Sequence, residues 1–127
     1  MATDADTSDA DLVAHCRRWI AYRHRRQDFF DRDLFDECAW DMLLHLFIAD
    51  LQGQPITDEH LVAEAGCSLP VGLRWMAHLE KEGDIDRRVG TGDTMLVTIS
   101  DDARGRMRQL MTETLAELEQ LSANAAN

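Results

Sequence analysis

The sequence predicts a single, mainly α-helical domain that carries one small β-hairpin, an α+β fold. Its 127 residues are the length of one domain. Apolar residues recur at spacings of three and four over much of the chain, which is typical of amphipathic helices. Residues 85–99 combine two short β-forming stretches with a Gly-Thr-Gly-Asp turn between them, which is typical of a hairpin.

The composition argues against several classes of protein. Hydrophobic residues make up 45% and charged residues 29%, the balance of a soluble globular domain without a membrane span. The acidic N-terminus lacks the apolar segment of a signal peptide. Cys16, Cys38 and Cys67 form no Cys-x-x-Cys pair and are odd in number. We therefore expect a cytoplasmic protein with reduced thiols rather than a disulfide scaffold.

The sequence lacks the common motifs for catalysis and cofactor binding. It has no phosphate-binding loop, no Gly-x-Ser-x-Gly motif and no His-Glu-x-x-His motif. Its five histidines show no spacing suited to zinc. We therefore expect no enzymatic activity, no cofactor and no metal site.

The charge is strongly acidic but unevenly distributed. A net charge of −11 argues against nucleic-acid binding, which usually requires a basic surface. However, five arginines lie within residues 12–27, whereas the excess acid lies mostly in residues 1–11 and 28–64. The basic stretch is compatible with a phosphate-binding surface, and equally with pairing to the acidic stretch that follows it.

The first half of the chain predicts an acidic lead and two helices. Residues 1–8 read as a flexible lead, and residues 9–121 as one domain. A first helix is expected over residues 9–27; its apolar stripe consists of Leu12, Cys16, Trp19 and Ile20. Residues 34–51 are the most hydrophobic stretch and predict a central core helix with a single solvated stripe. That stripe consists of Asp33, Glu37, Asp41 and His45.

Capping residues divide the next segment into two helices joined by a tight turn. Thr57 is a good N-cap for a short helix, and Gly66 suits the left-handed residue that ends it. Ser68 can cap a second helix over residues 69–82, with Pro70 in its first turn. A short helix joined by a glycine turn to a second helix is the helix-turn-helix unit.

The second of these helices is expected to have two different faces. Its inner face consists of Leu69, Leu73, Met76 and Leu79. Its outer face consists of Pro70, Val71, Arg74, His78 and Lys81. We expect Trp75, on the flank between them, to pack against a neighbouring helix.

The remaining residues predict a hairpin and a long final helix. Strands over residues 85–89 and 94–99 follow the helix-turn-helix directly, so the hairpin is a wing. Ser100 can cap a helix that runs to residue 121, and residues 122–127 are expected to fray. Together the elements predict a winged helix-turn-helix flanked by N- and C-terminal helices.

Five stretches within residues 38–108 also resemble a known family. They are CAWDMLL at 38–44, residues 61–66, LRWM at 73–76, LEKEG at 79–83 with Ile85, and ISDDAR at 99–104. In this order they resemble the winged helix-turn-helix domain of MarR-type bacterial transcriptional regulators. The last stretch is similar to the LTxxGR sequence with which the family enters the helix after the wing.

The resemblance implies a dimeric regulator that binds duplex DNA. Residues 69–82 would lie in the major groove, and the wing over residues 85–99 would reach an adjacent minor groove. Arg74 matches an arginine commonly found in the DNA-reading helix of the family, and it also lies at the centre of the exposed face. The residues expected to contact DNA are Ser68, Pro70, Val71, Arg74, His78, Arg87, Arg88 and Thr91.

Two departures from the family pattern favour an alternative function. Pro70 and Val71 stand where the family usually has Ser or Thr, and they cannot donate a hydrogen bond to a base edge. No Lys or Arg lies between Val89 and Ala103, where the family usually has a wing arginine. With the acidity of the chain, these features favour a winged-helix module for protein–protein contact that does not bind DNA. The sequence identifies no small-molecule effector.

The apolar stripe of the last helix predicts a homodimer. This stripe extends beyond the hairpin, where one small domain offers little to cover it. The residues expected at the dimer interface are Leu12, Cys16, Trp19, Ile20, Met111, Leu115 and Leu118. Alternatively, the first helix folds back on the last one within the same chain and closes a monomer.

Overall fold

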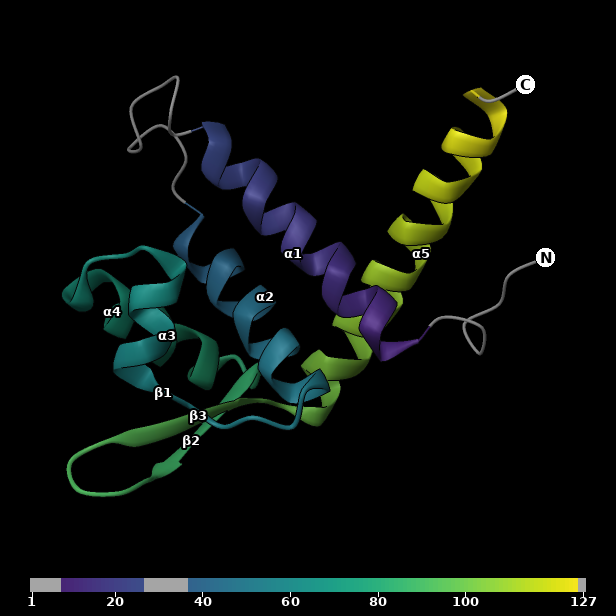
Figure 1. Cartoon of the computed structure of the whole chain (residues 1–127). Coiled ribbons are helices and arrows are strands. Elements are labelled where there is room, and N and C mark those ends of the chain that lie inside the picture. The colour runs from purple at the N-terminus through teal and green to yellow at the C-terminus, as the bar shows by residue number, and fades with distance from the viewer. Residues whose placement is uncertain (1–7, 27–36, 126–127) are drawn as a thin grey trace.

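The computed structural model describes residues 8–26 and 37–125. Within these residues the helices and strands are α1 Asp9–Arg26, α2 Cys38–Leu51, β1 Ile56–Thr57, α3 Asp58–Ala65, α4 Leu69–Lys81, β2 Ile85–Val89, β3 Met95–Ile99 and α5 Asp101–Ala125 (Figure 1). Apart from Ser8, the predicted acidic lead lies outside the described residues. None of the described helices is both long and apolar enough to cross a lipid bilayer.

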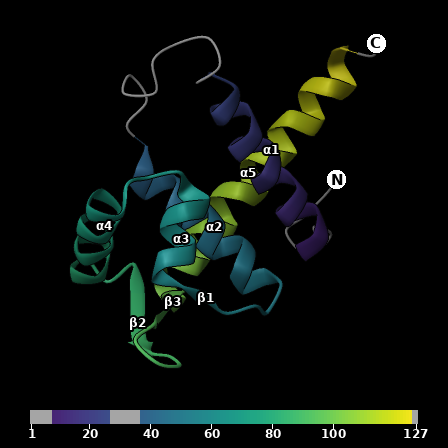
Figure 2. The ribbon, with the colours of Figure 1, turned by 60° about the vertical axis from the view of Figure 1, so that its left-hand side comes forward.

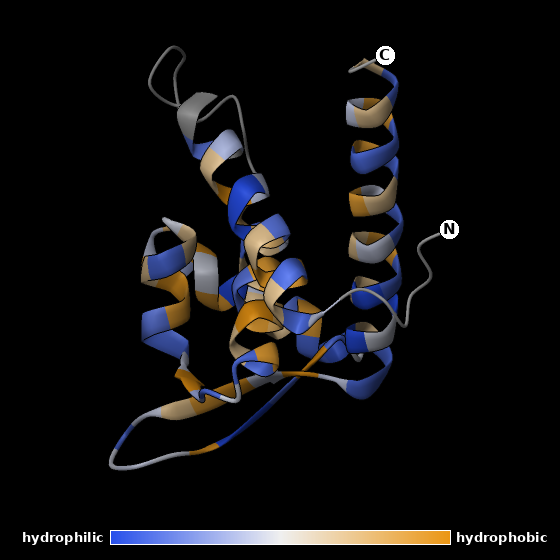
Figure 3. Cartoon of the chain, turned by 45° about the vertical axis from the view of Figure 1, so that its right-hand side comes forward, coloured by the Kyte–Doolittle hydropathy of each residue, from blue (hydrophilic) through white to orange (hydrophobic). Residues whose placement is uncertain are grey.

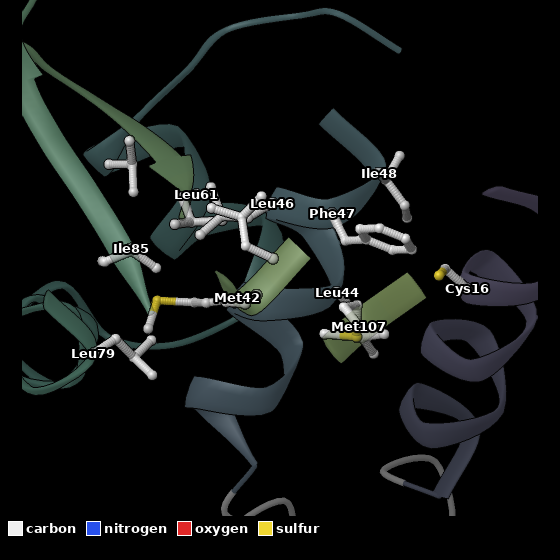
Figure 4. Close-up of a cluster of buried hydrophobic side chains, with 14 of the residues drawn as sticks. Cys16, Met42, Leu44, Leu46, Phe47, Ile48, Leu61, Leu79, Ile85 and Met107 are labelled. Carbon is white, nitrogen blue, oxygen red and sulfur yellow. The ribbon is translucent and has the colours of Figure 1, made fainter. Parts of the chain in front are cut away.

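Helix α2 forms the centre of the hydrophobic core, as predicted. Its side chains Met42, Leu44 and Phe47 are fully buried. Figure 4 shows them among side chains from other elements, including Cys16, Leu61, Leu79, Ile85 and Met107. The helix begins at Cys38, after the non-helical Glu37, and therefore later than the predicted residue 34. Every other described helix contributes to this single core.

The prediction of a solvated stripe on α2 is wrong for Asp41. This residue is only 5% exposed, and its Oδ2 lies 3.5 Å from Nε2 of His24 on α1. His45, one turn later, is half-buried. The stripe faces α1 and α3 rather than water, because both helices pack against α2. Asp33, also assigned to the stripe, lies outside the described residues.

The predicted capping residues occupy the expected positions. Oγ1 of Thr57 accepts a hydrogen bond of 3.2 Å from the His60 N–H, and Gly66 ends α3 with a left-handed φ of 73°. Oγ of Ser100 likewise accepts one of 3.2 Å from the Ala103 N–H at the start of α5. Ser68 is the N-cap residue of α4 but makes no capping bond through its side chain.

The sheet has one strand more than predicted. Its order is β1-β3-β2, with both neighbours antiparallel to β3. In the hairpin, Ile85 pairs with Ile99 and Val89 with Met95. The additional strand β1 has only two residues, and its Ile56 pairs with Val97. It ties the segment after α2 to the base of the wing.

Helix α1 packs against α5 within the same chain, and this overturns part of the predicted dimer interface. Four residues assigned to that interface are buried in the single chain: Leu12, Cys16 and Met111 are 0% exposed and Leu115 is 8% exposed. They are core residues, in agreement with the alternative in which the first helix folds back. Trp19 and Ile20 are half-buried, and Leu118 is exposed. Helix α5 continues to Ala125, past the predicted end at residue 121 (Figure 3).

The expectation of three reduced thiols is wrong for two of the cysteines. Cys38 and Cys67 are joined by a disulfide, with their Cα atoms 6.0 Å apart. Cys16 is free and buried between helices, and burial raises the pKa of its thiol to about 12. The fold brings the start of α2 beside the turn between α3 and α4, a proximity that 29 intervening positions conceal in the sequence.

Candidate DNA-binding surface

Helix α4 has the two faces that its sequence predicts, with two exceptions, Leu69 and Val71. Met76 and Leu79 are buried and Leu73 is half-buried, but Leu69 is 45% exposed in the first turn. On the other side Ser68, Pro70, Arg74 and His78 are exposed, and Val71 is half-buried. This exposed face lies at the same end of the molecule as the wing (Figures 1 and 2).

Arg74 is the central cation of this face. Its side chain is exposed and forms no ion pair or hydrogen bond with any residue that the structure describes. A guanidinium group presents five N–H donors in a fixed plane, which suits both phosphate oxygens and the acceptors of a guanine edge. Arg74 is therefore available to an external anion, whereas Arg87, Arg104, Arg106 and Arg108 already pair with carboxylates.

Trp75 packs on the flank of α4 against the hydrophobic core, as predicted. Its ring also meets that of His78 edge-on, with 5.7 Å between the ring centroids. This contact lies within the exposed surface and fixes the imidazole near Arg74, one turn away along the helix.

The angle between α3 and α4 depends on two glycines. Gly66 supplies the left-handed residue of the turn, and Gly72 permits close contact between the helices. A Cβ at position 72 would lie 2.5 Å from Cγ2 of Val62 on α3, which is closer than carbon atoms can approach. The position of the exposed face relative to α3 therefore depends on the close packing of the Gly72 backbone against the Val62 side chain.

The two arginines predicted to contact DNA from the wing have different surroundings. Arg88 is exposed, and nothing in the described part of the chain pairs with it. Arg87 is half-buried, and its Nη2 donates a hydrogen bond of 2.8 Å to Oε1 of Glu80 on α4. This bond lowers the pKa of the Glu80 carboxyl and raises that of Arg87. Arg87 thus links the wing to α4, a role that the sequence did not reveal.

The wing tip carries polar and acidic groups. Thr91 and Asp93 are exposed, and the turn is closed by Oγ1 of Thr94, which donates a hydrogen bond of 2.6 Å to the Thr91 carbonyl. Gly92 adopts a left-handed φ of 65°. The tip offers an anion only backbone N–H groups and the Thr91 hydroxyl.

The arginines of α1 do not extend this surface. Arg17 and Arg18 are exposed on α1, which lies on the opposite side of α2 from the wing (Figures 1 and 2). The side chains of Arg23, Arg25 and Arg26 lie outside the described residues. Arg17 and Arg18, the two arginines of the basic stretch that can be placed, therefore do not form one continuous surface with α4 and the wing.

Two cavities lie away from α4 and the wing. One of about 700 Å³ is bounded by α1, α2 and α3, and His24, His45 and His60 line it. Nε2 of His45 is buried there without a hydrogen-bond partner among the described residues. The other, of about 610 Å³, opens between α1 and the C-terminal half of α5, beside Trp19, Trp40, Leu118 and Leu121. Within the described residues no group of His, Cys, Asp and Glu has the arrangement to hold a metal ion.

The fold is similar to that of several solved proteins, one of which, MepR, is a transcription regulator. MepR of Staphylococcus aureus in complex with DNA matches with a TM-score of 0.57 at 18% identity, over 91% of this chain and 89% of MepR. A second structure of MepR, a transcription regulator of the multidrug efflux pump MepA, matches with a TM-score of 0.57 at 16% identity, over 86% of this chain and 76% of MepR. The protein AF1382 of Archaeoglobus fulgidus matches with a TM-score of 0.56 at 14% identity, over 68% and 91%.

These likenesses concern the fold. They confirm the predicted class, a mainly helical winged helix-turn-helix with flanking helices. No protein-family model and no curated protein matches the sequence.

Proposed function

We propose that this chain is a DNA-binding transcriptional regulator that reads duplex DNA with α4 and the wing. The observation that carries the proposal is Arg74, an exposed guanidinium with no partner among the described residues, at the centre of the second helix of a helix-turn-helix. The likeness to MepR in its complex with DNA supports the same function. Such a protein needs no catalytic group or cofactor, and it would act in the cytoplasm, where bacterial DNA is accessible.

The proposed regulator is a homodimer. The exposed leucines Leu118 and Leu121 line the open cavity between α1 and α5, beside the rings of Trp19 and Trp40. An apolar surface of this kind is suited to burial against the same surface of a second copy. Two copies would present two α4 helices to half-sites about one DNA turn apart. No small-molecule effector is assigned.

A second candidate function is a winged helix used for contact with another protein. Three observations favour it: the net charge of −11, the exposed Asp93 at the wing tip, and the apolar pair Pro70 and Val71 on the exposed face. A protein-binding surface needs no basic charge, so these acidic and apolar features are compatible with it. The DNA-binding experiment separates the two candidates.

The test measures binding to random and selected duplex DNA over a salt series. The dissociation constant of a DNA-binding protein rises steeply with salt, because each phosphate contact releases counterions. Arg74→Ala is expected to weaken binding to selected DNA by about 1–3 kcal/mol if Arg74 contacts a base edge. Equal weakening on random DNA would assign Arg74 to phosphate.

Arg17→Ala is the matched control, because Arg17 is equally exposed and unpaired among described residues but lies on α1. It is expected to leave DNA affinity unchanged. An absence of binding to any duplex at low salt would refute the DNA-binding function and favour the protein-contact module.

A further inference from the structure

The Cys38–Cys67 disulfide connects the central helix to the helix-turn-helix turn. Cys38 is the first residue of α2, and Cys67 lies between Gly66, which ends α3, and Ser68, which precedes α4. Breaking this bond therefore releases a covalent connection directly next to the helix that carries Arg74. The crosslink plays no part in the proposed contact with DNA, so its position calls for a separate explanation.

The first turn of α4 has few other anchors. Leu69 is 45% exposed, Pro70 is exposed, and Ser68 makes no side-chain capping bond. Beyond the first turn, Gly72 contacts Val62 of α3, and Leu73 and Trp75 pack against the core that surrounds α2. Packing therefore holds the later turns of α4 to α2 and α3, and the disulfide is the covalent link that fixes the N-terminal end of α4 to the core helix.

We propose that Cys38 and Cys67 form a reversibly oxidised dithiol site, and that the disulfide form is the form with high affinity for DNA. This inference rests on the proposed DNA-binding function. Reduction removes the covalent link between the start of α4 and α2. The first turn of α4 must then become ordered when DNA binds, and the lost conformational entropy weakens binding. The site takes a hydroperoxide as oxidant, and two molecules of a small thiol such as glutathione as reductant.

The chemistry of the site is a two-electron exchange. Cys67 is half-buried just before α4, whereas Cys38 is only 8% exposed, so Cys67 is the more accessible of the two sulfurs. The Cys67 thiolate attacks one peroxide oxygen, the O–O bond breaks, and the leaving alkoxide or hydroxide takes a proton. The Cys38 thiolate then attacks the sulfur of the resulting sulfenic acid and displaces hydroxide, which leaves as water after protonation. Two thiols and one hydroperoxide thus give the disulfide, water and an alcohol or a second water.

The third cysteine serves as an internal control. Cys16 is fully buried and the pKa of its thiol is raised, so it stays protonated and does not react with the oxidant. Cys16→Ala is expected to leave the redox response intact. Cys38→Ser and Cys67→Ser each remove it, and the two variants must behave alike because either one abolishes the same bond.

The first experiment follows the bond itself without DNA. The full chain is equilibrated in glutathione buffers of increasing reducing strength, the free thiols are alkylated, and the modified residues are identified by mass spectrometry. The expected result is alkylation of Cys38 and Cys67 together in reducing buffer, and recovery of the disulfide after addition of hydrogen peroxide. A disulfide that no glutathione buffer opens would be purely structural and would overturn the proposal.

The second experiment measures the response of α4 and of DNA binding. Reduction is expected to weaken DNA binding about threefold to thirtyfold, because a few immobilised residues cost that much in binding, and to accelerate amide hydrogen exchange over residues 66–72. The Cys38→Ser variant is expected to show the reduced values in both buffers. If both forms bind DNA equally, the redox coupling is wrong while the DNA-binding function stands. If neither form binds DNA, the proposed function fails, and unchanged hydrogen exchange on reduction would then overturn the coupling of the disulfide to α4.

Discussion

Arg87 and Arg88 are neighbours in β2, but only Arg88 presents an unpaired charge to solvent. Arg88→Ala is expected to weaken DNA binding on all sequences and to reduce the slope of log K against log salt by about one unit. Arg87→Ala is expected to change the slope less, since Glu80 already neutralises the Arg87 charge at 2.8 Å. Titrations of both variants over the same salt series check this, and equal slopes would show that the pairing with Glu80 does not persist on DNA.

His15 predicts a loss of stability in acid. Its side chain is buried on α1, and its Nε2 accepts a hydrogen bond of 3.3 Å from the Trp19 indole N–H and lies 2.8 Å from Oγ1 of Thr114 on α5. Burial, followed by the charge of Arg18, lowers the pKa of His15 below its ordinary value of 6.5. The folded state therefore resists protonation more than the unfolded state does.

The free energy of unfolding is accordingly expected to be highest above pH 6.5 and to fall as the pH drops below it. Burial lowers the pKa of His45 as well, so the two residues act in the same direction. Urea unfolding of the wild type, His15→Gln and His45→Gln at neutral and mildly acidic pH measures this. Each variant should lose less stability on acidification, and an identical loss in all three proteins would exclude these histidines as the cause.

At the scale of elements, Gly72 and Gly105 form a matched pair for testing the α3–α4 contact. A methyl group at position 72 would meet Val62 at 2.5 Å, whereas one at position 105 on α5 would meet nothing within 4 Å. Gly72→Ala is expected to lower the free energy of unfolding by about 1–3 kcal/mol through overpacking. Gly105→Ala is expected to raise it by about 0.5–1 kcal/mol through helix propensity. Chemical denaturation checks both signs, and a neutral Gly72→Ala would mean that the two helices separate easily.

The elements that the sequence predicts correctly are those with local signals. Thr57, Gly66 and Ser100 act on backbone groups within three residues of themselves, so their type and position define helix ends directly. The hairpin strands and the exposed position of Arg74 on α4 likewise follow from short-range periodicity.

The features that sequence reasoning missed all depend on distant partners. β1 is two residues long and exists only through its pairing with Val97 and Leu96. Asp41 fits a solvated stripe until α1 covers it, and Arg87 appears free until α4 brings Glu80 beside it. The disulfide joins positions 29 apart. In each case the controlling contact lies in another element, which periodicity along one helix or strand does not encode.

At the scale of the whole molecule, the exposed end of α5 tests the proposed dimer. Leu118 and Leu121 are 48% and 63% exposed, so replacing both with glutamate should leave the single chain folded. In a dimer that buries them, the double variant is expected to become monomeric and to lose affinity for paired half-sites. Ala116→Glu, exposed on another face of α5, is the control that should stay dimeric. Light scattering at micromolar concentration measures the mass, and a monomeric wild-type protein would rule out the dimer.

The strand order β1-β3-β2 also bears on the solubility of the wing. β3 is paired on both sides, whereas β2 has one open edge whose backbone groups are free to add a strand from another molecule. Val89, 75% exposed at the end of β2, would favour such stacking. However, the three residues that precede Val89 in β2 are charged: Asp86, Arg87 and Arg88. In a parallel stack in register, Asp86 would meet Asp86 and Arg88 would meet Arg88, and these like charges would repel, so the two residues act as gatekeepers against β-aggregation of the hairpin in this register.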